Sequence, residues 1–246
     1  MKRLLSFLMA VVLLIALVPC CFADEAKTVT LQNAAQLMQI IDPDFKSPIS
    51  ITRAVLTRGE SSDEIYLVIL AGTKSPIRNI NNIPSCVLSS FSLPNTFLSK
   101  LKQLMKEHIP AGADVVFAGH SLGGMVAQQA AADKSLKSRY NILNITAFGS
   151  PLVPVSGMEG SLHRLADKSD IVPALGIAGL LNYKYAVSFE KAGYRLLGNK
   201  AHTDSYPRED IWGAYDCFGV KGGDAVISFD TDDLFRYPYL PNSILF

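Results

Sequence analysis

The stretch of sequence that most constrains the fold is Gly119 to Gly124, which reads Gly-His-Ser-Leu-Gly-Gly. An apolar run typical of a buried strand precedes it at residues 114–118, and a run of good helix formers follows it at residues 125–132. A Gly-x-Ser-x-Gly sequence between a strand and a helix predicts a turn so tight that the serine adopts a strained backbone conformation with its hydroxyl exposed. The chain is therefore expected to hold a reactive serine, Ser121, on a strand–turn–helix unit.

The rest of the chain alternates between runs typical of strands and runs typical of helices. Strands are predicted at residues 51–57, 64–70, 140–148 and 161–166, helices at 30–41 and 95–108, and a further hairpin at 183–189 and 194–197. The first two strands form a hairpin, and the others alternate with helices, which indicates βαβ units. We expect a single α/β domain with a mainly parallel sheet flanked by helices, and functional loops at the carboxyl ends of its strands. Residues 222–246 carry no repeat or domain signature.

Composition and charge argue against several classes of protein. With 246 residues, 49% of them hydrophobic, the chain can bury one sizeable core. Its formal net charge of +1 and the lack of a long basic cluster argue against a nucleic-acid partner. No spacing of cysteine and histidine resembles a metal site. We expect neither a metal nor an organic cofactor, and no obligate protein partner is evident.

Residues 1–23 have the pattern of a secretory signal peptide. Lys2 and Arg3 precede an almost unbroken apolar run, and residues 21–23 fit a cleavage site. The apolar run is short for a membrane span and has no stop-transfer flank, which favours secretion over an uncleaved anchor or a lipid-modified cysteine. The mature domain is then expected to comprise residues 24–246. Its two cysteines are compatible with one disulfide or two buried thiols, and they are Cys86 and Cys217.

A reactive serine needs a histidine that takes its proton and a carboxylate that holds the histidine in the right tautomer. His120 is adjacent to Ser121 and cannot fold back onto it, whereas His108 and His163 lie in a predicted helix and a predicted strand. His202 remains, in a loop that is predicted to follow the last strand and to precede a short helix. It also fits the order serine, acid, histidine that is expected for a serine on a strand–turn–helix unit of this kind.

The acid must then lie between Ser121 and His202. The carboxylates in that interval are Asp133, Glu159, Asp167, Asp170 and Glu190. Asp167 and Asp170 both lie at the end of a predicted strand, where a loop that carries the catalytic acid is expected. The apolar residues 171–173 would shield a hydrogen bond from Asp170 to the histidine. Asp170 is therefore the preferred acid, with Asp167 as the alternative.

Five motifs occur in an order that resembles the class 3 lipases, the fungal-type triacylglycerol lipase group of α/β-hydrolases, from about Val55 to Tyr206. They are residues 70–73, 119–124, 148–151, 170–173 and 202–206, which read Leu-Ala-Gly-Thr, Gly-His-Ser-Leu-Gly-Gly, Phe-Gly-Ser-Pro, Asp-Ile-Val-Pro and His-Thr-Asp-Ser-Tyr. The resemblance implies an α/β-hydrolase fold with Ser121, Asp170 and His202 as a catalytic triad. It also implies that Thr73 and Leu122 form the oxyanion hole.

The expected function is a secreted serine carboxylic-ester hydrolase. A lipase that cleaves acylglycerol esters through an acyl-enzyme is favoured, and a phospholipase, a feruloyl esterase and a short-chain esterase are alternatives, because fold and triad do not choose among acyl substrates. A catalytically silent lipid-binding protein on the same scaffold is the alternative from another class.

Two apolar segments are candidates for the substrate site. Residues 74–94 would follow the oxyanion residue, and their apolar side chains, among them Ile77 and Ile80, recur at three- and four-residue intervals. This pattern predicts a lid that opens at a lipid–water interface, with an ordered surface loop as the alternative. Residues 171–182 follow the preferred acid, and we expect Val172 and Leu175 to line the substrate pocket.

Overall fold

The computed structural model describes residues 27–41, 47–72, 96–153, 156–175, 187–195 and 199–238. Several features singled out by the sequence lie outside these ranges: the signal segment 1–23, Thr73, the lid segment 74–94 with Ile77 and Ile80, and Cys86. The predictions made for those positions stay predictions.

In the described part of the chain, nine strands form one sheet in the order β1-β8-β2-β3-β4-β5-β6-β7, with β9 also paired to β2. The strands are β1 (Thr28–Leu31), β2 (Ile49–Arg58), β3 (Ser61–Leu70), β4 (Asp114–His120), β5 (Asn141–Phe148), β6 (Ser161–Asp167), β7 (Val187–Glu190), β8 (Val226–Asp230) and β9 (Phe235–Tyr237). Neighbours from β3 to β7 run parallel, and the other pairs are antiparallel. This confirms the predicted α/β architecture.

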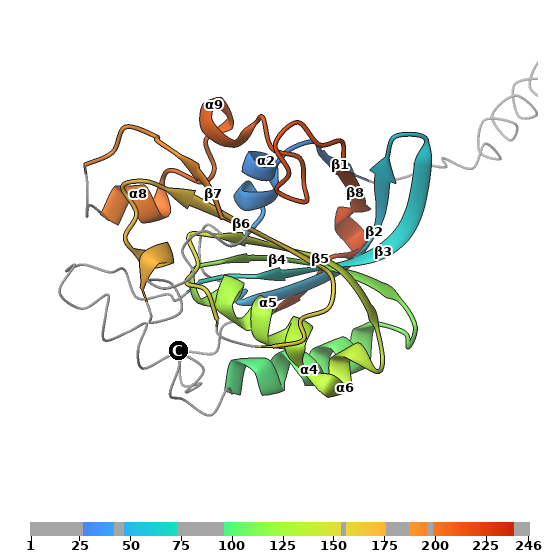
Figure 1. Ribbon diagram of the computed structural model, residues 1–246. Helices are drawn as coiled ribbons and strands as arrows, with labels where there is room; N and C mark the ends of the chain where they lie inside the picture. Colours follow the sequence, from blue (N-terminus) through green and yellow to red (C-terminus); the bar gives the residue numbers. More distant parts are fainter. Residues whose placement is uncertain are drawn as a thin grey trace, which may run out of the picture.

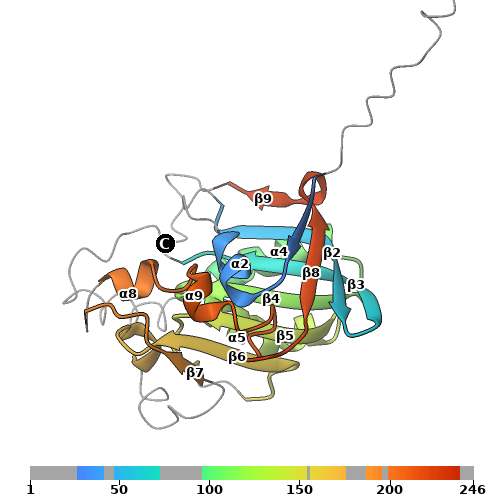
Figure 2. The ribbon, with the colours of Figure 1, turned by 90° about the horizontal axis from the view of Figure 1, so that it is seen from above.

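Helices cover both faces of the sheet (Figures 1 and 2). One face carries α4 (Thr96–His108), α5 (Leu122–Ala132) and α6 (Lys134–Lys137), and the other carries α2 (Ala34–Gln39), α8 (Asn199–Thr203) and α9 (Glu209–Trp212). Successive side chains of a strand point to opposite faces. In β3, Leu67 and Ile69 accordingly pack in the buried cluster that includes α2. Val68 and Leu70 pack in the cluster that includes α4 and α5.

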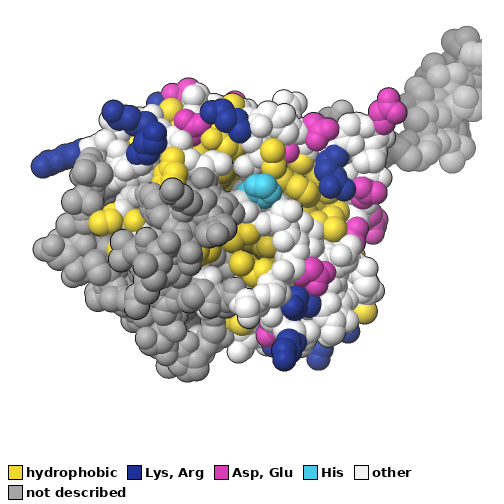
Figure 3. Space-filling model, viewed as in Figure 1, with side chains coloured by type: hydrophobic (Ala, Val, Ile, Leu, Met, Phe, Trp, Pro, Cys, Tyr) yellow, Lys and Arg dark blue, Asp and Glu magenta, His cyan; other side chains and the backbone are white. Residues whose placement is uncertain are grey.

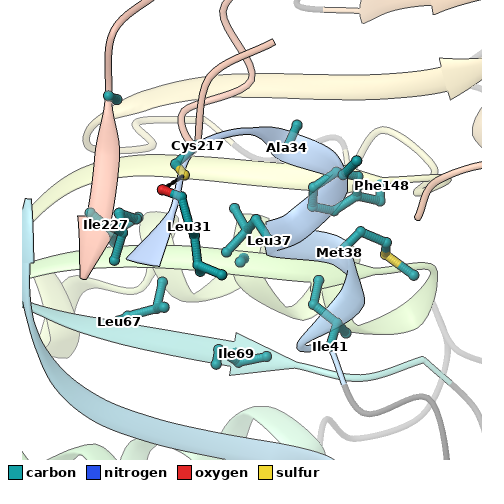
Figure 4. Packing of buried hydrophobic residues seen from close by; sticks show 14 of the residues in the cluster. Leu31, Ala34, Leu37, Met38, Ile41, Leu67, Ile69, Phe148, Cys217 and Ile227 are labelled. Carbon is teal, nitrogen blue, oxygen red and sulfur yellow. Dashed lines mark hydrogen bonds between the residues drawn. The ribbon is translucent and has the colours of Figure 1, made fainter. Parts of the chain in front are cut away.

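The first predicted helix, residues 30–41, is wrong in its N-terminal part. Thr28–Leu31 instead forms β1, which pairs with β8, and α2 begins only after Asn33. The Asn33 side chain accepts a hydrogen bond from the Gln36 N–H at 2.9 Å, and such an N-cap fixes the start of a helix. Both elements still bury their apolar side chains in one cluster, which includes Leu31, Leu37, Met38 and Ile41 (Figure 4).

Cys217 lies in the same cluster and is a free, buried thiol in the part of the chain that the structure describes. Its Sγ donates a hydrogen bond to the carbonyl oxygen of Leu31 at 3.1 Å (Figure 4). Burial raises the pKa of this thiol to about 12. The thiol therefore packs as a small apolar group at neutral pH.

Of the two predicted hairpins, one is confirmed and one is wrong. β2 and β3 pair antiparallel through a turn at Gly59 and Glu60, which is shorter than the polar stretch suggested. The second was predicted at residues 183–189 and 194–197, of which 183–186 and 196–197 lie outside the described residues. In the described part, β7 pairs parallel with β6, and residues 191–195 are not a strand. The backbone carbonyl of Tyr194 accepts a hydrogen bond from the Ser169 hydroxyl instead, so this segment packs on the loop after β6.

The C-terminal part of the chain, which had no signature of its own, completes the sheet. β8 and β9 lie one after the other along the outer edge of β2, with Phe229 opposite Ala54 and Tyr237 opposite Ile49. β1 then pairs with the other side of β8. These strands protect the edge of β2, which would otherwise present unpaired backbone groups.

The described surface carries charges of both signs. In the view of Figure 3, lysine and arginine side chains are interspersed with aspartate and glutamate rather than gathered in one basic patch. Among the helices in the described ranges, none combines the length and the apolar character needed to cross a bilayer.

Candidate active site

The turn between β4 and α5 holds Ser121 in a strained backbone conformation. Its φ of 54° and ψ of −119° make it the one non-glycine residue with a positive φ in the described ranges. A Cβ on Gly119 would lie 2.6 Å from the carbonyl carbon of Gly123, and a Cβ on Gly123 would lie 2.1 Å from the carbonyl oxygen of Leu70. Only glycine fits both positions, because α5 packs against the strands that closely. The Ser121 N–H donates to the carbonyl oxygen of Phe148 at 2.9 Å, which ties the turn to the end of β5.

The structure brings the predicted serine, histidine and acid together. The Nε2 atom of His202 lies 3.0 Å from the Oγ of Ser121, and its Nδ1 lies 2.9 Å from Oδ2 of Asp170. All three residues are buried, with 6–7% of each exposed. A carboxylate accepts the Nδ1 proton, so Nε2 is left free to accept the serine proton. His202 lies in the short helix α8, so the predicted loop at this position is wrong.

Asp170 is held as an ionised acceptor. Its Oδ1 accepts the Val172 N–H at 3.0 Å, and its Oδ2 also accepts the Tyr206 hydroxyl at 2.6 Å. Burial by itself raises the pKa of Asp170, but the charge of the His202 imidazolium and the hydrogen bonds outweigh it, so the pKa lies below its ordinary value. Burial and the Asp170 charge raise the pKa of Tyr206 well above its ordinary value, so the phenol stays protonated and donates.

The alternative acid, Asp167, is bound elsewhere. Its carboxylate accepts hydrogen bonds from the Ser169 N–H at 2.7 Å, the Ala192 N–H at 3.2 Å and the Ser205 hydroxyl at 2.7 Å. These bonds hold the loop after β6 against its neighbours. The remaining acids of the interval also have other partners: Asp133 binds Lys102, Glu159 binds the Ile142 N–H, and Glu190 binds Lys221.

Sequence reasoning set His120 aside as a base, but the fold gives it a contact with the histidine that was chosen. His120 donates from Nε2 to the carbonyl oxygen of His202 at 2.9 Å, and the two rings lie 4.6 Å apart. Burial, followed by the His202 charge, lowers the pKa of His120 to about 3, so its ring is neutral at pH 7. The other two histidines lie elsewhere, His108 stacked on Phe235 and His163 in β6.

The position proposed for the oxyanion hole is described only in part. Leu122 is the first residue of α5, where backbone N–H groups lack an acceptor within the helix. No acceptor for the Leu122 N–H occurs among the hydrogen bonds of the described chain. Thr73 lies outside the described residues, but Gly72 precedes it, and a Cβ on Gly72 would lie 3.2 Å from the Cβ of Ser121. The chain therefore passes beside the serine immediately before Thr73.

A family model for lipases of class 3 matches residues 55–178. The chain belongs to the class 3 lipase family. It therefore has an α/β-hydrolase fold and is a hydrolase of the lipase or esterase type. The matched region contains Ser121 and Asp170, and His202 lies beyond it. No curated protein matches the chain.

Beside Ser121, this class 3 lipase has a cluster of apolar side chains that we call the apolar wall. Its buried members are Met125, Val153 and Val172, and its partly buried members are Leu122, Ile171 and Leu175. The wall joins the helix that begins after the serine to the loops that follow β5 and β6. Both predicted pocket residues of the described ranges, Val172 and Leu175, belong to it.

The sequence did not assign a separate role to two residues that contact the triad, Tyr206 and His120. Tyr206 was part of a motif, and only the fold shows that its hydroxyl reaches Asp170. His120 offered no separate signal, because its partner is a backbone carbonyl far along the chain. In the described ranges, no three His, Cys, Asp or Glu side chains are grouped so that they could hold a metal ion.

Proposed function

We propose that this class 3 lipase is a secreted serine hydrolase that cleaves acylglycerol esters through an acyl-enzyme on Ser121. The observation that carries the proposal is the continuous hydrogen-bond chain from the Ser121 hydroxyl through His202 to Asp170. The positive φ of Ser121 adds to it, because that conformation presents the hydroxyl at the tip of the turn, within 3.0 Å of His202 Nε2.

In the proposed reaction, Ser121 Oγ attacks the ester carbonyl while His202 Nε2 takes the hydroxyl proton. The oxygen of the tetrahedral intermediate accepts hydrogen bonds from the backbone N–H groups of Leu122 and Thr73. His202 then gives its proton to the departing alcohol, which leaves an acyl-enzyme. Water attacks the acyl-enzyme by the same route and releases the fatty acid. Asp170 stays ionised throughout and stabilises the imidazolium.

The environment of Asp170 supports this role. A carboxylate can stabilise an imidazolium only while it is charged, and the lowered pKa of Asp170 keeps it charged at neutral pH. The hydrogen bonds from Tyr206 and Val172 hold its two oxygens, so that Oδ2 remains aimed at His202 Nδ1.

The apolar wall supports an acyl substrate. An aliphatic chain gains about 0.8 kcal/mol for each buried methylene, and the wall offers six apolar side chains beside the serine. The sequence patterns of residues 1–23 and 74–94 motivate the proposals of secretion and of a lid that opens on lipid. Both segments lie outside the described residues.

A panel of esters tests the proposal. The full mature chain and its Ser121→Ala variant are assayed on triglycerides, a phospholipid, a feruloylated saccharide and short soluble esters. We expect the native chain to prefer triglycerides and the variant to be inactive. A preference for another member of the panel would reassign the substrate, and binding of lipid without hydrolysis would indicate a silent lipid-binding protein.

The lid is tested separately on a medium-chain triglyceride. The rate per enzyme should jump when the substrate passes its solubility limit, because the lid opens on the lipid surface. Ile77→Asp with Ile80→Asp should abolish the jump and spare a soluble short ester. A smooth saturation curve that the double variant leaves unchanged would contradict the lid.

A further inference from the structure

Two loops hold much of the apolar wall in place beside Ser121. The β5 loop, residues 149–153, follows β5, and the acid loop, residues 168–175, follows β6. The two loops touch: a Cβ on Gly149 would lie 3.0 Å from Oδ2 of Asp170. Their placement therefore affects both the wall and the acid.

Gln128 of α5 holds the β5 loop through a fully buried amide. Its Nε2 donates to the carbonyl oxygen of Gly124 at 3.0 Å, to the Ser150 hydroxyl at 3.3 Å and to the carbonyl oxygen of Pro151 at 2.9 Å. Its Oε1 accepts the Val153 N–H at 3.0 Å. One side chain thus fixes the loop at three points, the last being the backbone of a wall residue.

Arg164 of β6 joins the β5 loop to the acid loop. Its side chain is buried, with 1% of the residue exposed. Nη2 donates to the carbonyl oxygen of Ser150 at 2.8 Å and to that of Pro173 at 2.8 Å, and Nε also faces the Ser150 carbonyl at 3.3 Å. Pro173 directly follows the wall residue Val172. The guanidinium therefore holds both loops at once.

We propose that Gln128 and Arg164 are positioning residues that place the apolar wall and so set the acyl-chain preference of the enzyme. The inference rests on the proposed function, because it assigns the wall to the acyl chain. Hydrogen bonds run from α5 through Ser150 to β6 and on to the acid loop. This brace links the helix that begins at the proposed nucleophile to the loop that carries the proposed acid.

The hydrogen bonds of Gln128 and Arg164 orient the loops, which apolar side chains of equal size could not do. Burying an amide or a guanidinium is unfavourable unless its hydrogen bonds are made. An apolar residue would avoid the unfavourable burial of its own polar groups. It would, however, leave the loop carbonyls without donors and therefore free to rotate. The β5 loop also lies directly on α5, since a Cβ on Gly124 would be 2.6 Å from the Ser150 Cβ. A small rotation of the loop would therefore shift Val153 relative to the other residues of the wall.

The first arm of the test compares chain lengths. In Gln128→Leu, kcat/KM for a twelve-carbon p-nitrophenyl ester should fall by roughly ten- to a hundredfold, as expected when buried hydrogen bonds are lost. Most of the change should appear in KM, because ground-state contacts with the acyl chain are affected. The two-carbon ester, whose acyl group is too short to extend along the wall, should change by less than about threefold.

Asn144→Leu is the matched control. Asn144 is another fully buried amide, but it lies in β5 and binds Thr146 and the carbonyl oxygen of Phe218, away from the wall. Its loss should lower stability and leave the ratio between the two esters unchanged. An equal loss on both esters in Gln128→Leu would show that Gln128 only supports folding, and would overturn the proposal.

The second arm does not depend on activity. Hydrogen exchange at the Val153 amide, followed by NMR or mass spectrometry, should be faster in Gln128→Leu and in Arg164→Met than in the native chain. Arg164→Lys keeps a cation that can donate to the carbonyls, so it should restore part of the protection. Unchanged exchange in folded Gln128→Leu would overturn the brace even if Arg164→Met fails to fold. Native protein that hydrolyses no ester would instead overturn the proposed function and leave the exchange result standing.

Discussion

At the scale of single residues, the hydroxyl of Tyr206 explains why Asp170 rather than Asp167 faces His202. It donates to Oδ2 of Asp170 at 2.6 Å and accepts the backbone N–H of Asp167 at 3.2 Å. The backbone of one aspartate thus anchors the phenol that holds the carboxylate of the other. The sequence could narrow the acid to these two residues, because both lie at a strand end. The sequence could not show which of the two aspartates the phenol contacts, since Tyr206 lies more than thirty positions later in the chain.

The two aspartates should differ sharply on substitution. Asp170→Asn should lower kcat by about 10⁴-fold, because an amide in that place favours the wrong histidine tautomer. Asp167→Asn should have little effect on kcat, although it weakens three hydrogen bonds that hold the loop. Steady-state kinetics on one soluble ester measure both. If Asp167→Asn gave the larger loss, the acid would have to be reassigned.

His120 should make the stability of the protein depend on pH. Its pKa is about 3 in the fold and 6.5 when unperturbed, so between these values the unfolded chain binds a proton that the folded chain does not. The free energy of unfolding should therefore fall as the pH falls from about 6.5 towards 3, by up to about 1.4 kcal/mol per pH unit. His120→Gln keeps a donor for the His202 carbonyl and removes this proton.

Urea titrations of the native chain and of His120→Gln at pH 7, 5 and 4 measure this contribution. The variant should lose less stability than the native chain on acidification. Parallel loss in the two proteins would show that His120 is not held neutral by its surroundings.

At the scale of secondary structure, local sequence patterns predicted the elements whose conformation depends mainly on their own residues. The alternation in residues 51–57 and the apolar run in residues 64–70 predicted the β2–β3 hairpin, and the apolar face of residues 95–108 predicted α4. The predicted helix over residues 30–41 was wrong in its N-terminal part, and the strand predicted to begin at residue 194 was wrong over the described residues 194 and 195, because partners elsewhere decide the structure there. β8 draws residues 28–31 into the sheet, and the loop after β6 binds Tyr194.

The turn that carries Ser121 should not tolerate a side chain at Gly123. Its Cβ would lie 2.1 Å from the carbonyl oxygen of Leu70, so Gly123→Ala must push α5 away from β3. We expect a loss of about 3 kcal/mol or more in the free energy of unfolding, together with loss of activity. Gly112→Ala is the control, because Gly112 has a φ of 82° but nothing within 4 Å of its Cβ position.

Thermal or urea unfolding distinguishes the two glycine variants. Gly112→Ala should show only the cost of a positive φ, about 1 to 2 kcal/mol, with normal activity. Equal effects of the two substitutions would mean that the close approach of α5 to Leu70 does not account for the glycine at position 123.

At the scale of the whole molecule, the parallel strands of the sheet carry the site residues, and the antiparallel strands beside β2 contribute to stability. Ser121 and Asp170 follow the carboxyl ends of the parallel strands β4 and β6, as the alternation of strands and helices predicted. The antiparallel strands β8 and β9 along β2 come from a region with no recognisable signature. They pair with β2, which lies more than 160 residues earlier in the chain, and no local sequence pattern indicates such a contact.

Phe229 of β8 should therefore matter for stability and not for turnover. Its side chain is 4% exposed and packs in the cluster that holds α2 on the sheet. Phe229→Ala should lower the free energy of unfolding by about 3 to 5 kcal/mol through the lost burial and the cavity. Turnover per folded molecule, measured well below the melting temperature, should match the native chain. A lower kcat in fully folded protein would show that β8 influences the site.

The most direct measurement of the central claim is covalent labelling by a fluorophosphonate probe, located by peptide mass spectrometry. A serine activated by His202 should react stoichiometrically in the native fold, and the label should be found on Ser121. Ser121→Ala should not be labelled, and His202→Ala should react at most slowly. Labelling of a different residue, or equal labelling of native protein and Ser121→Ala, would contradict the account.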